Sequence, residues 1–310
     1  MDRVQHLPVL PARVAEVLAE ALRKLGAWLL DGTLGAGGHS ALLLEAHPDL
    51  RVWGTDQDES MLEVARERLA PFGDRVVTTR SRISELERRF DSGEVPFEGA
   101  PAAMLFDVGV ASPHLDNPER GFSFQADAPL DMRMDRRREV TAADLVNELP
   151  EGELADILYH EGDERRSRQI AAAIVASRRR APILRTGVLS ELVAGVVGKG
   201  GGRIHPATRT FQALRREVNR EDHELRAALA LAENRLEPGG LLAVIGFHSG
   251  ENRLVKRWAR EAERRGVFER VHKKPLVADA AEERANPRAR SAELRTLRRL
   301  APPGGGEAAA

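Results

Sequence analysis

The 310-residue chain is long enough for one large domain or two, and 42% hydrophobic residues with a net charge of −1 are ordinary for a globular protein. No apolar run approaches the roughly 18 residues of a membrane span, and the N-terminus lacks the basic-then-apolar layout of a signal peptide. The absence of cysteine excludes disulfides, thiolate metal sites and cysteine nucleophiles. We therefore expect a cytoplasmic protein.

Short apolar runs bounded by turn residues predict five buried strands, at residues 27–31, 51–55, 75–79, 102–106 and 241–247. Helical patterns over 39–46, 59–69 and 83–90 separate the first four. Strands that alternate with helices at this spacing indicate an α/β fold, with right-handed crossovers and helices on both faces of a parallel sheet.

The fifth strand follows the fourth only after about 135 residues, which is too far for a single crossover. The interval holds helical patterns at 142–147, 151–160, 163–180 and 188–197, and a long helix predicted over 208–236 would lead back to the sheet. We expect a discontinuous sheet domain (1–115 and 204–300) with an inserted helical domain (116–203). Runs at 267–273 and 294–300 predict an antiparallel edge pair, and 301–310 a disordered tail.

A glycine-rich segment, DGTLGAGGHS (Asp31–Ser40), follows the first strand and indicates a nucleotide-type cofactor site, because glycines allow the backbone to approach a ligand. Asp56 ends the second strand about 20 residues later, where a carboxylate accepts hydrogen bonds from ribose hydroxyls. Ser40 replaces the third glycine of a dinucleotide motif, and a P-loop lysine is absent. The acidic loop favours a cationic, phosphate-free cofactor such as S-adenosylmethionine, and a tight turn without a ligand is the alternative.

The segment after the fourth strand, DVGVASPHLDNPERGFSFQADAPLDMRMD (Asp107–Asp135), is a long loop without a helical or strand pattern, and such loops tend to be functional. Its acidic residue Asp107 lies at a strand's carboxyl end, where open α/β sheets bind ligands. Its two Phe and two Met residues suit a planar ligand, although core packing explains them equally well.

Charge is distributed unevenly along the chain. Residues 1–115 carry a net charge of about −6, and residues 251–300 carry about +7. An acidic N-terminal part and a basic C-terminal part are compatible with an anionic polymer that binds one face of the protein. Short basic runs such as Arg136–Arg138 and Arg178–Arg180 are more often solvated helix surface than nucleic-acid contacts.

Together these motifs resemble the bacterial 16S ribosomal RNA N4-cytosine methyltransferases, the RsmH (MraW) family. The other matching segments, in chain order, are HLPVL (His6–Leu10), RGFSF (Arg120–Phe124), PLDMRMD (Pro129–Asp135), HPATRTFQALRREVN (His205–Asn219), FHS (Phe247–Ser249), RLVKR (Arg253–Arg257) and NPRARSAELR (Asn286–Arg295). The resemblance implies a Rossmann-like class I methyltransferase sheet with a helical insert. It also implies S-adenosylmethionine as cofactor, and a specific cytidine near the decoding centre of the small subunit as substrate.

The resemblance and the chemistry of methyl transfer together suggest site residues. Expected cofactor contacts are Gly35, Gly37, Gly38, His39, Asp56, Ile83, Asp107 and His114. The exocyclic amine of cytosine is a poor nucleophile because its lone pair is delocalised, so we expect Asp107 and Ser112 to accept its hydrogens during catalysis. The flipped base and its strand would be bound by Pro113, Arg120, Phe122, Arg133, Arg209, Arg215, His248 and Ser249.

Three positions depart from the family pattern. His114 stands where a glutamine is usual, Ile83 where an aromatic residue is usual, and Gly250-Glu251-Asn252 where Leu-Glu-Asp is usual. We expect no metal site, because the nine histidines lack ligand spacing. Small-subunit ribosomal RNA is the expected partner, and a homodimer stays open. The alternatives are a methyltransferase acting on DNA or protein, and a non-catalytic RNA-binding protein that retains the cofactor pocket.

Overall fold

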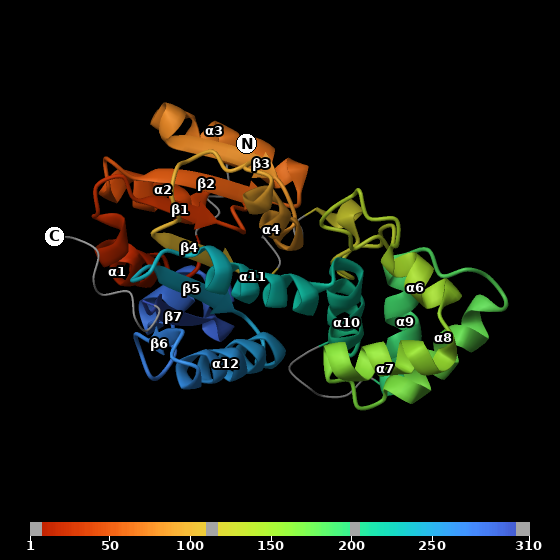
Figure 1. The fold of residues 1–310 in the computed structure, drawn as a ribbon. Helices are drawn as coiled ribbons and strands as arrows, with labels where there is room; N and C mark the ends of the chain where they lie inside the picture. Colours follow the sequence, from red (N-terminus) through yellow and green to blue (C-terminus); the bar gives the residue numbers. More distant parts are fainter. Residues whose placement is uncertain (1–7, 110–116, 199–204, 302–310) are drawn as a thin grey trace. The chain divides into compact units, whose positions relative to one another are not determined.

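A computed structural model describes residues 8–109, 117–198 and 205–301 (Figure 1). The chain forms two compact units, one made of Met1–Gly109 with Asp222–Ala310 and the other of Val110–Glu221. We call them the sheet unit and the helical unit. No helix in the described part of the chain is long and apolar enough to cross a membrane.

The sheet unit is built on seven strands in the order β3-β2-β1-β4-β5-β7-β6. The strands are β1 (Trp28–Asp31), β2 (Arg51–Asp56), β3 (Val76–Arg80), β4 (Ala103–Asp107), β5 (Leu241–Gly246), β6 (Phe268–Arg270) and β7 (Glu293–Arg299). Strands β1 to β5 are parallel, and β7 pairs antiparallel with both β5 and β6. The predicted α/β fold and antiparallel edge pair are therefore confirmed. The apolar strands are explained by their position, since helices cover both faces.

Two hydrophobic cores lie on opposite faces of this sheet. One contains side chains of α1 (Pro11–Leu22), α2 (Gly38–Ala46) and α3 (Glu59–Leu69). The other contains side chains of α4 (Ile83–Asp91), α11 (Glu221–Arg235) and α12 (Ser249–Arg264). A short helix, α13 (Ala280–Ala285), precedes β7. Helices α1 and α12 are absent from the sequence-based expectation, although both have apolar residues at helical spacing.

The helical unit contains α6 (Ala142–Glu148), α7 (Glu151–Gly162), α8 (Ser167–Arg178), α9 (Thr186–Val197) and α10 (Thr208–Asn219) around a separate apolar core. The loop that precedes α6 contributes Phe122, Leu130, Met132 and Met134 to this core. Core packing therefore accounts for the apolar residues of the loop that we expected to grip a ligand.

The single helix predicted over 208–236 is wrong. Arg220 has a left-handed backbone (φ 51°), which ends α10, and its amide donates to the carbonyls of Arg216 and Glu217. Helix α11 then begins at Glu221. The first part, α10, packs against α7 in the helical unit, where Arg216 forms an ion pair with Glu161 (3.0 Å).

Candidate active site

Parallel strands bring four sequence-predicted positions to one edge of the sheet. Asp56 and Asp107 are the last residues of β2 and β4, Asp31 is the last residue of β1, and His248 follows β5 closely. The strand register pairs Asp31 with Gly54 and Leu105, and Asp107 with Ile245. This carboxyl edge is where open α/β sheets bind ligands.

The glycine loop between β1 and α2 is held to this edge by Asp56. Its Oδ2 accepts a hydrogen bond from the Gly35 amide (2.8 Å), and its Oδ1 accepts one from the Asp58 amide (2.9 Å). Gly35 and Gly37 have φ of 52° and 76°, a region that side chains disfavour. A Cβ on Gly37 would also lie 3.1 Å from Leu69. The glycines are therefore required by the turn, and Asp58, not Asp56, caps helix α3.

Two acidic side chains and a histidine meet beneath the glycine loop. Asp31 accepts hydrogen bonds from the Ser40 hydroxyl (2.6 Å) and the Thr33 amide (3.3 Å). Burial raises the pKa of Asp31 to about 6, and the hydrogen bond from Ser40 opposes that rise. Asp107 is fixed from its backbone, whose amide donates to Thr33 Oγ1 (2.6 Å).

His39 and Asp107 leave buried polar atoms unsatisfied. His39 Nε2 lies 3.6 Å from Asp107 Oδ2, which is too long for a hydrogen bond. Within the described residues, neither His39 Nε2 nor Asp107 Oδ1 has a hydrogen-bond partner. A buried polar group without a partner costs about 1–3 kcal/mol. Such atoms at the carboxyl edge indicate a place for a polar ligand.

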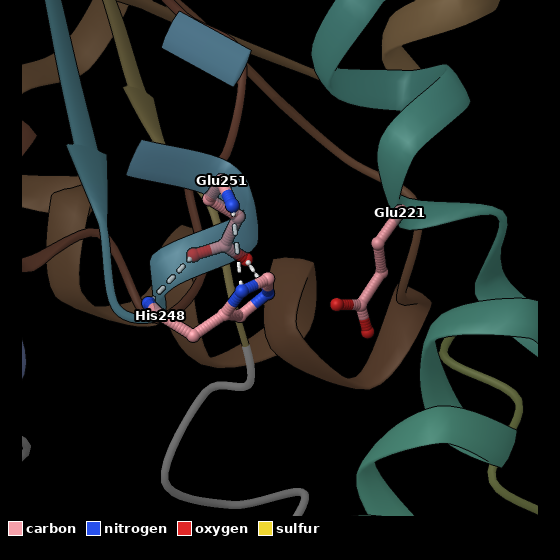
Figure 2. Close-up of side chains that lie close together, drawn as sticks. All are labelled: Glu221, His248 and Glu251. Atoms are coloured by element: carbon pink, nitrogen blue, oxygen red, sulfur yellow. Dashed lines mark hydrogen bonds and ion pairs between the residues drawn. The ribbon is translucent and has the colours of Figure 1, made fainter. Parts of the chain in front are cut away.

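His248 is the N-cap of α12 and lies under its first turn (Figure 2). Its Nδ1 accepts hydrogen bonds from the amides of Gly250 (3.1 Å) and Glu251 (3.3 Å), and its Nε2 lies 2.9 Å from Glu251 Oε1. Glu251 also accepts from the Phe247 amide (2.7 Å) and is almost fully buried. His248 thus shapes the end of β5, and Ser249 is the first residue of the helix.

Ile83 begins α4 and is 9% exposed, packed in the core that contains Leu86 and Trp53. Its neighbour Ser84 donates through its amide to Glu224 on α11 (2.8 Å). Core packing alone accounts for Ile83, and its contact with an adenine stays a prediction. Three further expected site residues, Ser112, Pro113 and His114, lie outside the described residues.

The arginines expected to bind RNA have different surroundings in the helical unit. Arg120 is 6% exposed and donates to the carbonyls of Arg133 (2.9 Å) and Met134 (3.2 Å). Arg133 forms a bidentate pair with Asp131, at 2.8 and 2.9 Å, which holds the pKa of that carboxyl below its usual value although burial opposes it. These bonds give Arg120 and Arg133 a role in holding the loop, so their phosphate contacts stay predictions.

Two more arginines lie on α10. Arg215 forms a bidentate pair with Glu221 (2.7 and 2.8 Å), whereas Arg209 is exposed and donates a long hydrogen bond to the Asp163 carbonyl (3.4 Å). Arg209 is therefore the most accessible of the four arginines. Phe122 is 6% exposed in the core of the helical unit.

Three residues with a part in this geometry are missing from the sequence-based set. Thr33 positions Asp107, Ser40 holds Asp31, and Glu251 orders the turn after β5. Thr33 and Ser40 lie inside the glycine motif itself, so their polar side chains were a readable signal. Glu251 has the three-residue spacing of a capping box with His248, but a histidine is not a usual N-cap residue, so the pair was not predicted.

The residues at the carboxyl edge fit S-adenosylmethionine. Its ammonium and sulfonium groups are cationic, and the edge offers Asp31, Asp56 and Asp107 together with a positive-φ glycine turn that leads into α2. Among the described residues, Asp107 Oδ1 and His39 Nε2 have no hydrogen-bond partner, so both atoms are available to a polar ligand. Ser40 stands in place of the third glycine of a dinucleotide motif, and the loop has no P-loop lysine.

Comparison with known proteins agrees with this geometry. The model of the MraW methylase family matches residues 3–300. "Ribosomal RNA small subunit methyltransferase H" of Methylobacterium sp. (strain 4-46) is 48% identical over 322 residues, covering 98% of this chain and 93% of that protein. Its counterpart in Cyanothece sp. is 46% identical and covers 95% of each chain.

Among solved structures, an rRNA methylase from Streptococcus thermophilus covers 94% of each chain with a TM-score of 0.40 and 13% identity. The family model and the two sequence relatives each span nearly the whole chain. The resemblance found in the motifs is thereby confirmed, and the chain belongs to the MraW methylase family.

Proposed function

We propose that this chain is an S-adenosylmethionine-dependent methyltransferase that modifies N4 of a specific cytidine in 16S ribosomal RNA, near the decoding centre. The observation that carries the proposal is the buried Asp107 Oδ1 at the end of β4, an acceptor without a hydrogen-bond partner among the described residues, in a chain of the MraW methylase family. Its relatives are small-subunit ribosomal RNA methyltransferases by name. The protein acts in the cytoplasm, and the sheet and helical units serve as methyltransferase and substrate-recognition domains.

Cofactor binding is assigned to the sheet unit. Gly35, Gly37 and Gly38 let the cofactor approach the backbone, and Asp56 accepts hydrogen bonds from its ribose. His39 and Asp107 meet its polar groups, and Ile83 packs against its adenine. His114 contributes a further polar contact. The bound cofactor supplies an electrophilic methyl group on a positively charged sulfur.

The protein's part in the reaction is to activate and orient the cytosine amine. An acceptor on an amine hydrogen draws the nitrogen lone pair out of conjugation with the ring. Asp107 and Ser112 supply such acceptors, and the rate gain comes from positioning and local electrostatics. The base leaves its stack and is held by Pro113 and Phe122. The surrounding strand is contacted by Arg120, Arg133, Arg209, Arg215, His248 and Ser249.

Incubation with cofactor labelled in its methyl group tests the function. Small subunits that lack the modification are the substrate, and digestion to nucleosides identifies the product. We expect label in N4-methylcytidine. Label in DNA or protein would favour another amine acceptor, and binding of RNA without any transfer would favour a non-catalytic protein. Light scattering of the purified chain tests whether it forms a homodimer.

Substitution of Asp107 by Asn separates its two proposed roles, because the amide keeps one oxygen acceptor but loses the negative charge. If Asp107 acts on the cytosine amine, kcat falls by at least about 100-fold while the cofactor Kd changes little. A large rise in the cofactor Kd with an unchanged kcat would assign Asp107 to cofactor binding alone. Asp49→Asn, at an exposed position of the same unit, is the matched control.

A further inference from the structure

A basic groove lies in the sheet unit, away from the glycine loop. It encloses about 200 Å³ between α12, β6, the loop after β6, and β7. Lys256 and Arg260 line it from α12, Lys273 and Lys274 from the loop, and Arg295 from β7. None of its lining residues is acidic. Part of the net positive charge of residues 251–300 therefore lies in one groove.

Three arginines on or near α12 are paired with carboxylates. Arg264 pairs with Glu261, Arg265 with Glu233, and Arg270, at the groove wall, with Glu263. In contrast, Lys256, Arg260, Lys273 and Lys274 have no ion pair within the described residues. Lys273 lies near Glu263, whose pKa is lowered mainly by its hydrogen bond with Arg270 and to a smaller extent by Lys273. The groove therefore concentrates positive charge that the protein itself does not compensate.

Arg295 is a second, independent indication that the groove binds an anion. Its side chain is 14% exposed and its Nη2 pairs with Glu293 at 2.9 Å. Its Nε, however, is buried without a hydrogen-bond partner among the described residues. A guanidinium presents its donors as a planar fork that matches the oxygens of a phosphate. An anionic oxygen in the groove would satisfy this Nε.

The strand register places the β7 wall of the groove beside residues 242–244 of β5. Arg295 on β7 pairs with Val244 on β5, and two residues further Glu293 pairs with Gly246 at the end of β5. The chain after β6 continues along β7, with a bridge between Leu276 and Leu294. On α12, Lys256 lies about 10 Å along the helix axis from Ser249, which follows β5. The Arg295 end of the groove therefore lies about 7 Å along β5 from the carboxyl end of that strand.

We propose that this groove binds the phosphate backbone of the ribosomal RNA strand whose cytidine is methylated. The inference rests on the proposed function and adds a substrate contact in the sheet unit. The contacts are sequence-independent, because lysine and arginine side chains bind phosphates as charges. They supply affinity and register, while base selection belongs to other residues.

Charge reversal at two positions tests the groove. In Lys256→Glu/Lys274→Glu, two elements that line it each lose a cation. The matched control, Arg23→Glu/Arg88→Glu, makes the same change of charge at exposed arginines of the same unit that have no ion pair with any described residue. A fluorescently labelled fragment of small-subunit ribosomal RNA is titrated at salt concentrations from about 50 to about 300 mM. Calorimetry with S-adenosylhomocysteine verifies that each variant retains its fold.

We expect the groove variant to bind the RNA at least about 10-fold more weakly and to lower the salt slope by about 2, one for each lost phosphate contact. Lys256→Arg/Lys274→Arg should restore binding, and the control should stay close to the wild type. Equal weakening in the groove variant and the control would overturn the proposal, because general electrostatics would then suffice. So would unchanged RNA affinity accompanied by lost binding to vesicles that contain phosphatidylglycerol.

The groove and the proposed function fail in different ways. If the wild type methylates small subunits but the groove variant binds RNA normally, the groove assignment is wrong and the function stands. If the wild type transfers no methyl group while the groove variant alone loses RNA affinity, the function is wrong and the groove still binds RNA.

Discussion

Asp31 carries a pH dependence of stability that follows from its burial. Its pKa is about 6 in the folded protein, against 3.8 for an ordinary aspartate, so the folded state binds the proton more tightly. The resulting stability is fully present below about pH 4 and is lost as the pH rises toward 6. The difference of about two between the two pKa values corresponds to about 3 kcal/mol in the free energy of unfolding.

Asp31→Asn removes this titration and keeps an oxygen that can accept from Ser40. We expect the free energy of unfolding of the variant, relative to the wild type, to rise by up to about 3 kcal/mol between pH 4 and pH 7. Denaturant titrations at several pH values measure it, with the exposed Asp49→Asn as control. A difference that stays constant over this pH range would contradict the assignment.

Asp56 is the residue on which the cofactor assignment depends most directly. Asp56→Ala removes both the proposed ribose acceptor and the bond that holds the Gly35 amide. We expect cofactor binding to weaken by about 1–3 kcal/mol in calorimetry. Asp58→Ala removes the cap of α3 and should reduce stability by about 1 kcal/mol with little effect on cofactor affinity. Unchanged affinity in Asp56→Ala would remove Asp56 from the cofactor site.

At the scale of elements, Asn219 connects two sequence motifs of the helical unit. It lies at the end of α10 and is fully buried. Its Nδ2 donates to the Met132 carbonyl (2.8 Å) and the Arg215 carbonyl (2.8 Å), and its Oδ1 accepts from the Met134 amide (2.8 Å). One side chain therefore holds the irregular segment before α6 against α10.

Asn219→Ala should leave a buried amide and a buried carbonyl of that segment without partners. Each such group costs about 1–3 kcal/mol, so we expect the helical unit to lose at least about 2 kcal/mol of stability. Hydrogen exchange of α10 and the Met132–Met134 amides measures the loss. Gln125→Ala, at an exposed position of the same loop, is the control. A change within about 0.5 kcal/mol would show that the network is dispensable.

Helices and strands could be predicted from the sequence where their burial requires a recognisable run of apolar residues. The five parallel strands are short apolar runs because both faces of the sheet are covered. The break at Arg220 was not predictable, because an arginine in the left-handed region carries no compositional signal, unlike a glycine. The N-cap role of His248 was missed for a similar reason, since Ser, Thr, Asp and Asn are the usual caps.

At the scale of the whole molecule, the sequence indicated where charge accumulates but not which charges are free. Residues 251–300 carry about +7, yet Arg264, Arg265 and Arg270 are paired in the structure. Only the three-dimensional arrangement separates these from the unpaired cations of the groove. The same holds for the candidate site. The glycine motif and the acidic strand ends could be predicted from the sequence, whereas the hydrogen-bond partners of Thr33 and Ser40 could be identified only in the folded structure.

The division into two units predicts a regional response to the cofactor. All the described cofactor residues belong to the sheet unit. A ligand at a concentration of about 100 times its Kd stabilises the unit that binds it by about 2.7 kcal/mol. Amide hydrogen exchange that requires unfolding of that unit therefore slows by about 100-fold. With saturating S-adenosylhomocysteine we expect protection in β1, the glycine loop and α3. Helices α7, α8 and α9 should exchange at unchanged rates.

Hydrogen exchange followed by mass spectrometry measures this pattern. In Asp56→Ala the same protection should appear only at a higher ligand concentration, because the fold of the unit is kept while its affinity falls. Equal protection of the sheet unit and of α7–α9 would contradict the prediction. It would mean that the two units respond to the ligand as a single cooperative body, so that cofactor binding in one unit is felt by the helices proposed to recognise the RNA.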